Sequence, residues 1–248
     1  MNIEVVGQRG APARVPPFSR EEFDRRLARV QDEIVARGLD FLVVTTPEDV
    51  YYLTGFHTIG YVITPQWLVL GVNIEPTLVV RAGERSNADG HSWVQKIVPY
   101  GEGAGAIGVT RDLTASGGTI GLDINCRFIT LRTARDLEAM AGGRAVDASD
   151  VVLTIRRVKS EEELRQVEKA ARTSDAAMQG ALETVAEGVS DREVAAAMNA
   201  RVILSGSAYI SLPMAVSAGS ETAYMHNIDP ARIYFDFYWF CAMVCHEH

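Results

Sequence analysis

Four consecutive apolar residues, Phe41–Val44, constrain the fold of this chain more than any other feature. A continuous apolar run of this length is typical of a β-strand that is buried on both faces. A helix is expected before it, because Ser19 and Glu22 have the spacing of a capping box. Apolar residues then recur at helical intervals from Phe23 until Gly38 ends the pattern. The sequence therefore predicts an α/β domain with a mixed sheet and helices.

Helix and strand signals continue to about residue 155. The expected helices run from Pro47 to Gly55 and from about Thr130 to Met140, and the expected strands cover residues 67–72, 77–80, 96–98, 119–124 and 146–153. The first three strands have the pattern of a meander. Residues 101–108 contain too much glycine to show the periodicity of a helix or of a strand, and their glycines lack the spacing of a phosphate-binding loop. We expect one domain at residues 19–156, after an arm at 1–18 that is rich in Gly and Pro.

The pattern changes at about residue 157, where two capped helices follow one another. Each begins with a serine that is followed three residues later by a glutamate, at Ser160 and at Ser190. The second helix leads into an apolar stretch at residues 209–217, and a loop of small residues after it presents His226. A second domain is therefore expected at residues 157–248.

Composition narrows the class of protein. The chain has 248 residues, 47% of them hydrophobic, and a net charge of −8, which argues against a nucleic-acid partner because phosphate binding requires clustered Lys and Arg. The densest basic stretch, residues 156–159, is interpreted as a solvated junction. No apolar run reaches the roughly 20 residues that span a bilayer, so no membrane role is expected. Residues 1–4 do not begin a signal peptide and the cysteines lack disulfide spacing, so we expect a cytoplasmic protein.

Three stretches together resemble the creatinase, prolidase and aminopeptidase P family. Residues 47–56, PEDVYYLTGF, are similar to the signature of that family's N-terminal domain. Residues 155–164, IRRVKSEEEL, resemble the linker where its catalytic domain of pita-bread fold begins. His226 occupies the place of the family's first active-site histidine. The resemblance implies an α/β N-terminal domain followed by an incomplete α+β pita-bread domain.

The resemblance also implies a chemistry, the hydrolysis of a C–N bond. The family's peptidases hold two divalent metals such as Mn, Co or Zn, whereas creatinase uses none and relies on a histidine as proton shuttle. Either role suits His226, because imidazole titrates near neutral pH. His57 and Tyr61 are candidate substrate-binding residues, since they follow the signature on a loop that in relatives reaches a neighbouring subunit's active site. A homodimer is therefore expected, with a small amide or an Xaa-Pro peptide as substrate.

The chain departs from the family after His226. The only acids there are Asp229, Asp236 and Glu247, and we expect the chain as given to lack most of the catalytic residues and to hold no metal pair. The C-x3-C-H-x-H tail at residues 241–248 is not expected to bind a metal, because its ligands are too closely spaced. The leading interpretation is an Xaa-Pro peptidase-like hydrolase. The alternatives are a metal-free amidohydrolase resembling creatinase or ectoine hydrolase, and a non-catalytic fragment that retains a dimerisation or binding surface.

Overall fold

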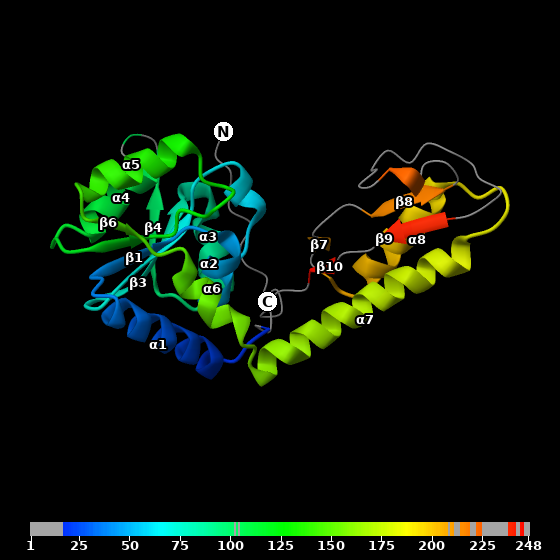
Figure 1. Ribbon diagram of the computed structural model, residues 1–248, viewed down its shortest axis with the longest axis horizontal. Helices are drawn as coiled ribbons and strands as arrows, with labels where there is room; N and C mark the ends of the chain where they lie inside the picture. The colour runs from blue at the N-terminus through cyan, green and yellow to red at the C-terminus, as the bar shows by residue number, and fades with distance from the viewer. Residues whose placement is uncertain are drawn as a thin grey trace, which may run out of the picture. The chain divides into compact units, whose positions relative to one another are not determined.

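A computed structural model of the chain describes residues 17–101, 103, 105–207, 209–210, 214–218, 222–224, 238–241 and 244–245 (Figure 1). The chain divides into two compact units, residues 1–158 and residues 159–248. Each unit has its own hydrophobic core.

The first unit is built on one six-stranded mixed sheet. Its strands are β1 (Phe41–Val44), β2 (Trp67–Gly71), β3 (Ile74–Arg81), β4 (Lys96–Tyr100), β5 (Ile120–Leu122) and β6 (Ala145–Asp147). Its helices are α1 (Arg20–Ala36), α2 (Pro47–Thr54), α3 (Arg85–His91), α4 (Gly105–Leu113), α5 (Leu131–Ala141) and α6 (Asp150–Arg157), with the 3-10 turns η1 (Ile59–Val62) and η2 (Ala82–Glu84). The strands lie in the order β4-β3-β2-β1-β5-β6. Strand β1 is antiparallel to β2 and parallel to β5.

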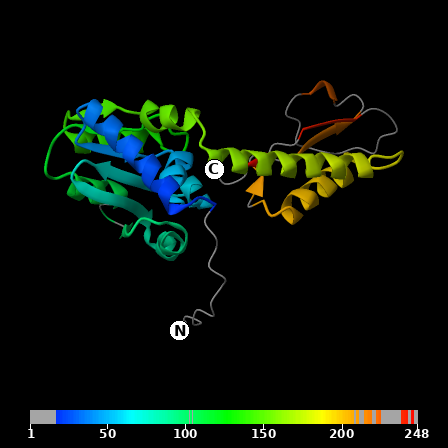
Figure 2. The ribbon, with the colours of Figure 1, turned by 90° about the horizontal axis from the view of Figure 1, so that it is seen from below.

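Strand β1 is buried along its whole length, as its continuous apolar run predicts. Leu42 and Val44 belong to a core with residues of α1, α2 and α6. Phe41 and Val43 belong to a second core with residues of α4 and α5. Because successive side chains of a strand point to opposite faces, the helices cover both sides of the sheet (Figures 1 and 2). The mixed α/β fold expected for this part of the chain is confirmed.

Three local expectations were wrong. The strand expected at residues 146–153 ends at Asp147, and α6 begins at Asp150, because Val151, Val152 and Ile155 reach the core at helical spacing. Strand β4 does not continue a meander: it is parallel to β3 and is reached through α3. The glycine-rich stretch contains the start of α4, at Gly105.

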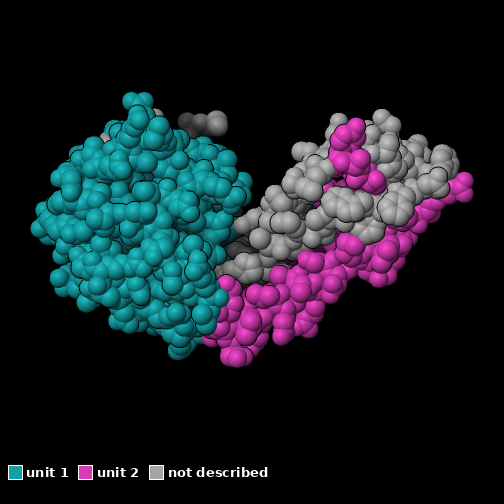
Figure 3. All heavy atoms as spheres, viewed as in Figure 1, with its two compact units in different colours: residues 1–158 teal, residues 159–248 magenta. Residues whose placement is uncertain are grey.

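The second unit, magenta in Figure 3, begins with the two capped helices that the sequence predicts. They are α7 (Glu161–Thr184) and α8 (Asp191–Leu204), and each has a complete capping box. Its strands are β7 (Tyr209–Ile210), β8 (Ala215–Ala218), β9 (Tyr238–Cys241) and β10 (Val244–Cys245), paired antiparallel as β8 with β9 and β7 with β10. The expected strand at 209–217 is thus divided into β7 and β8, with residues 211–213 outside the described part of the chain.

The two helices of the second unit pack closely at Gly180. A Cβ atom built there would lie 2.8 Å from Cγ of Arg201 and 3.2 Å from the carbonyl oxygen of Ala197. The core beside this contact is made by Ala177, Ala181, Val194, Met198, Val202, Met214 and Val216. Among the helices in the described residues of either unit, none combines the length and apolar character needed to cross a membrane.

Candidate functional site

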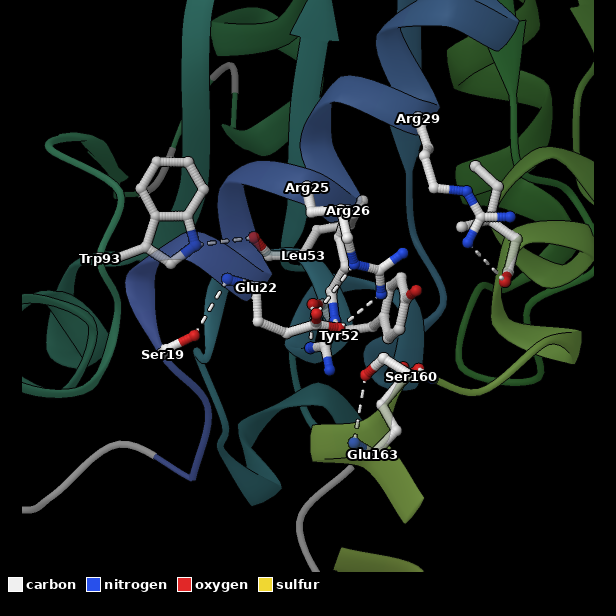
Figure 4. Close-up of polar contacts among 11 residues, drawn as sticks. Ser19, Glu22, Arg25, Arg26, Arg29, Tyr52, Leu53, Trp93, Ser160 and Glu163 are labelled. Carbon is white, nitrogen blue, oxygen red and sulfur yellow. Dashed lines mark hydrogen bonds and ion pairs between the residues drawn. The ribbon is translucent and has the colours of Figure 1, made fainter. Parts of the chain in front are cut away.

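The loop after α2 carries two of the three candidate residues, and hydrogen bonds fix its start. Gly55 ends α2 with a φ of 74°, a left-handed conformation that glycine adopts without strain. The Trp93 indole donates to the carbonyl oxygen of Leu53 at 2.8 Å (Figure 4). The Ser92 hydroxyl donates to the carbonyl oxygen of Thr54 at 3.1 Å. The last turn of α2 is therefore tied to the segment that follows α3.

His57 is half-buried at the beginning of this loop. Its carbonyl oxygen accepts a hydrogen bond from Nδ2 of Asn87 at 3.1 Å. Its ring lies edge-on to that of Tyr51, with centroids 5.9 Å apart. Contacts from both α2 and α3 thus hold the residue in place.

Residues 59–66, which we call the 59–66 segment, place apolar side chains outward and polar side chains inward. Ile59, Val62 and Ile63 are 79%, 73% and 82% exposed. Tyr61 and Gln66 are only 7% and 2% exposed, and within the described part of the chain neither the Tyr61 hydroxyl nor the Gln66 amide has a hydrogen-bond partner. This arrangement is the reverse of what burial energetics favours, so the segment is a candidate for contact with another molecule.

Polar atoms converge on Gly60 inside this segment. A Cβ atom at Gly60 would lie 2.6 Å from Oε1 of Glu84, 2.9 Å from Nε2 of Gln66 and 3.1 Å from Oγ1 of Thr58. The Thr58 hydroxyl accepts from the Gly60 amide at 2.9 Å. The other carboxylate oxygen of Glu84 accepts from Nδ2 of Asn87 at 3.1 Å. Asn87 therefore links Glu84 to the backbone of His57.

The phenol of Tyr61 is held in its neutral form. Burial raises the pKa of Tyr61 well above its usual range, and the charges of Cys126, Glu48 and Glu84 add to the increase. Its ring packs against that of Phe56, with centroids 6.1 Å apart. The neutral hydroxyl can both donate and accept a hydrogen bond.

A second group of charges lies where β1 and β5 end. The Asp123 carboxylate accepts from the amide of Thr46 at 2.8 Å and from that of Thr45 at 3.2 Å. Asp49 pairs with Arg156 at 2.5 Å. Burial raises the pKa of Asp49 to about 6, Arg156 opposes the increase, and the charges of Asp123 and Glu48 add to it. Asp49 is therefore a buried acid whose pKa lies close to neutral pH.

The third candidate, His226, lies outside the described residues, as do Asp229, Asp236 and Glu247. The structure thus describes His57 and Tyr61 four residues apart on one loop and gives no position for His226. Among the residues that it does describe, no group of three or more His, Cys, Asp or Glu side chains converges to hold a metal. This part of the chain offers no ligand set for the family's metal pair.

The burial of Gln66, the position of Glu84 and the pairing of Arg156 were not expected from the sequence. Gln66 directly precedes an apolar strand, and this position could have indicated that its side chain is buried. No sequence pattern indicates that Gln66 lies near Glu84. Arg156 was interpreted as solvated, but its side chain is 24% exposed and binds Asp49.

Comparison with known proteins identifies both units. Residues 26–158 match the family model described as the Creatinase/Prolidase N-terminal domain, and residues 165–247 match that of metallopeptidase family M24. A Sinorhizobium fredii protein named uncharacterized hydrolase/peptidase y4tL is 31% identical over 75% of this chain and 50% of its own length. A creatinase from a Bacillus species is 26% identical over 76% of this chain and 46% of its own length.

Solved structures show the same fold. The prolidase from Pyrococcus furiosus superposes with a TM-score of 0.70 at 21% identity, covering 84% of this chain and 62% of the prolidase. The chain spans about half the length of the curated relatives that it matches.

Proposed function

Because the chain belongs to the creatinase and prolidase family, we propose that it comes from a hydrolase that cleaves a C–N bond in a small substrate, an Xaa-Pro dipeptide in the first place. The observation that carries this proposal is the match of both family models, in order, across most of the chain. A relative from Pyrococcus furiosus that is named Xaa-Pro dipeptidase covers 82% of this chain at 24% identity and supports the choice of substrate.

In this proposal His226 transfers the proton. A neutral imidazole accepts a proton from the attacking water near pH 7 and returns it to the leaving nitrogen, which is the step that C–N cleavage requires. His57 is proposed as a substrate contact, because it is half-buried and held by Asn87. Tyr61 is proposed as a second contact through its neutral hydroxyl, which is buried and has no partner in the described chain.

We also propose that the protein works as a homodimer. The support is the exposed apolar surface of Ile59, Val62 and Ile63, which begins two residues after His57. Adjacent exposed apolar side chains are typical of surfaces that another protein covers. In such a dimer the 59–66 segment would lie in the interface between the two subunits.

The test measures hydrolysis by the 248-residue chain and by any longer form of the protein that contains it. Proline release from an Xaa-Pro dipeptide is followed with Mn²⁺, Co²⁺ or Zn²⁺ added and again with a chelator. Turnover that depends on metal and is lost in His226→Ala, while the control variant His91→Ala retains it, supports the proposal. Absence of turnover in every form, with every metal, contradicts it.

The creatinase match favours a second candidate, a metal-free amidohydrolase. A relative named ectoine hydrolase, 38% identical over 74 residues, points in the same direction. Creatine and ectoine are therefore assayed beside the dipeptide. Turnover of either compound that persists in the chelator would favour this second candidate over the peptidase.

A further inference from the structure

The stretch that leads from β5 into α5 differs in charge from the rest of the chain. Residues 124–135, which we call the basic segment, contain three arginines and no acid, in a chain with a net charge of −8. Arg127, Arg132 and Arg135 are all exposed. Arg132 lies in the first turn of α5, where the helix dipole makes a positive charge unfavourable. The stability of the helix therefore does not account for this charge.

Exposed apolar side chains accompany the arginines. Three of them are 45%, 41% and 67% exposed, namely Ile124, Phe128 and Leu131. Arginine and aromatic residues are enriched where proteins contact one another. The charge of Cys126, in the basic segment, acts on the phenol of Tyr61, so the basic segment lies near the 59–66 segment. It is therefore a neighbour of the apolar surface that we propose as a dimer contact.

A surface of the opposite charge lies on α7. Residues three and four apart on a helix share one face, and this spacing aligns five exposed residues that we call the α7 face: Glu161, Leu164, Glu168, Ala171 and Asp175. Acids alternate with apolar residues along it. Glu168 also pairs with Arg172 at 3.3 Å, but both side chains are exposed, and such a pair contributes little. The α7 face thus combines negative charge with apolar surface, as the basic segment combines positive charge with apolar surface.

The occupant that complements the basic segment is a second copy of the chain. Residues 159–248 carry 13 of the 32 Asp and Glu residues but only 7 of the 24 Lys and Arg residues. An anionic membrane would also attract arginines, but a net charge of −8 opposes the approach of the protein to it. The acidic surface of another copy meets no such opposition at the basic segment.

We propose that the basic segment of one protomer docks on the α7 face of a second copy, and that its partner makes the same contact in return. Two reciprocal contacts close a symmetric dimer, because each surface then meets its complement. The arginines would lie beside the acids of the α7 face, and the apolar side chains of the two surfaces would cover one another. This inference rests on the proposed homodimer and adds the surface of the partner that completes it.

The test reverses the charges of one surface at a time. One variant combines Arg132→Glu with Arg135→Glu, and the other combines Glu168→Arg with Asp175→Arg. Each variant alone faces like charges at both contacts, so its dissociation constant in analytical ultracentrifugation should rise about tenfold over that of the wild type. When the two variants are mixed in equal amounts, they should associate with nearly the wild-type affinity, because both contacts of the mixed dimer then join opposite charges.

Arg111→Glu reverses an exposed arginine of α4 and should leave the dissociation constant unchanged. Circular dichroism checks that each variant is folded, and Arg135→Glu alone replaces the double variant if that one unfolds. Unchanged association in both variants overturns the proposal, as does a mixture of folded variants that stays dissociated.

The outcomes also separate this contact from the proposals on which it rests. If Ile63→Ser dissociates the dimer and charge reversal does not, the homodimer stands and the contact with the α7 face is wrong. A monomeric wild type overturns both, and binding of that monomer to vesicles of anionic lipid would assign the basic segment to a membrane surface. Since mass is measured and not turnover, a failure here leaves the proposed hydrolysis untouched.

Discussion

Nη1 of Arg156 lies 2.5 Å from Oδ1 of Asp49, yet the pKa of this carboxyl is raised to about 6 rather than lowered. Asp49 is 5% exposed, and the loss of water around its charge outweighs the attraction of the guanidinium. The neighbouring charges of Asp123 and Glu48 act in the same direction as burial. At this site burial, and not the nearby guanidinium, therefore decides the direction in which the pKa of Asp49 is shifted.

The first prediction is that the stabilising contribution of Asp49 is lost as the pH rises. Its folded pKa of about 6 exceeds the ordinary value of 3.8, so between these values the folded state binds more protons than the unfolded state. The contribution is complete below pH 3.8 and disappears as the pH passes 6. The shift corresponds to about 3 kcal/mol.

The measurement is the free energy of unfolding of the wild type minus that of Asp49→Asn, across this pH range. We expect this difference to decrease as the pH rises. Asp24→Asn removes an exposed carboxylate from α1 and is the matched control. An increase of the difference with pH would mean that Arg156 dominates and that the argument from burial is wrong.

The second prediction concerns the space beside Gly60. Gly60→Ala places a methyl group 2.6 Å from Oε1 of Glu84 and 2.9 Å from Nε2 of Gln66, so one of these side chains must move. We expect the free energy of unfolding to fall by about 1–3 kcal/mol in chemical denaturation. Gly83→Ala, at a glycine with nothing within 4 Å of its Cβ position, should change stability much less. Equal effects of the two variants would contradict the crowding at Gly60.

The third prediction compares two arginines that bind the same acid. Arg26 is fully buried, pairs with Glu22 at 2.9 Å and lies over the ring of Tyr52 at 4.2 Å (Figure 4). Arg25 binds Glu22 from the surface at 2.7 Å with 40% of its side chain exposed. Arg26→Ala leaves a buried acid short of a partner and should cost about 3–5 kcal/mol, whereas Arg25→Ala should cost about 0–1 kcal/mol. Thermal or urea unfolding distinguishes them, and a larger loss in Arg25→Ala would overturn the ranking.

The fourth prediction tests the proposed dimer. Ile63→Ser removes the most exposed apolar side chain of the 59–66 segment and should shift the protein toward monomer without disturbing the core, because an exposed side chain contributes little to it. Light scattering at micromolar concentration measures the mass. Val35→Ser, at a residue of α1 that is 62% exposed, is the control and should leave association unchanged. A wild-type chain that is already monomeric would refute the proposal.

The central layer of the first unit could be predicted from sequence because its signals are local. Four apolar residues in a row at β1, Pro47 at the start of α2 and Gly55 at its end each determine their own conformation. The stretch from Val146 to Leu153 was expected to be a strand, but so short a pattern of apolar residues is compatible with a strand and with a helix. Only the burial of Val151, Val152 and Ile155 decides between them.

The polar side chains that surround Gly60 could not be predicted for a different reason. Gln66 and Glu84 are 18 positions apart, and whether a polar side chain finds a partner depends on how distant segments pack. Arg156 was misjudged in the same way, because its partner Asp49 lies 107 positions away. Capped helices and strands follow from neighbouring residues, whereas hydrogen bonding inside a core follows from the complete fold.

The position of β1 in the sheet bears on the order in which the chain can assemble during synthesis. One of its neighbours, β2, follows within the next 30 residues or so, but the other, β5, begins only at Ile120. The hydrogen bond from the Thr45 amide to the Asp123 carboxylate likewise joins residues that are 78 positions apart. While a ribosome is still producing the residues between them, one edge of β1 has no strand to pair with. An unpaired strand edge favours association with other chains. A pause in translation before residue 120 should therefore increase aggregation, and a pause after β5 and β6 have left the ribosome should not.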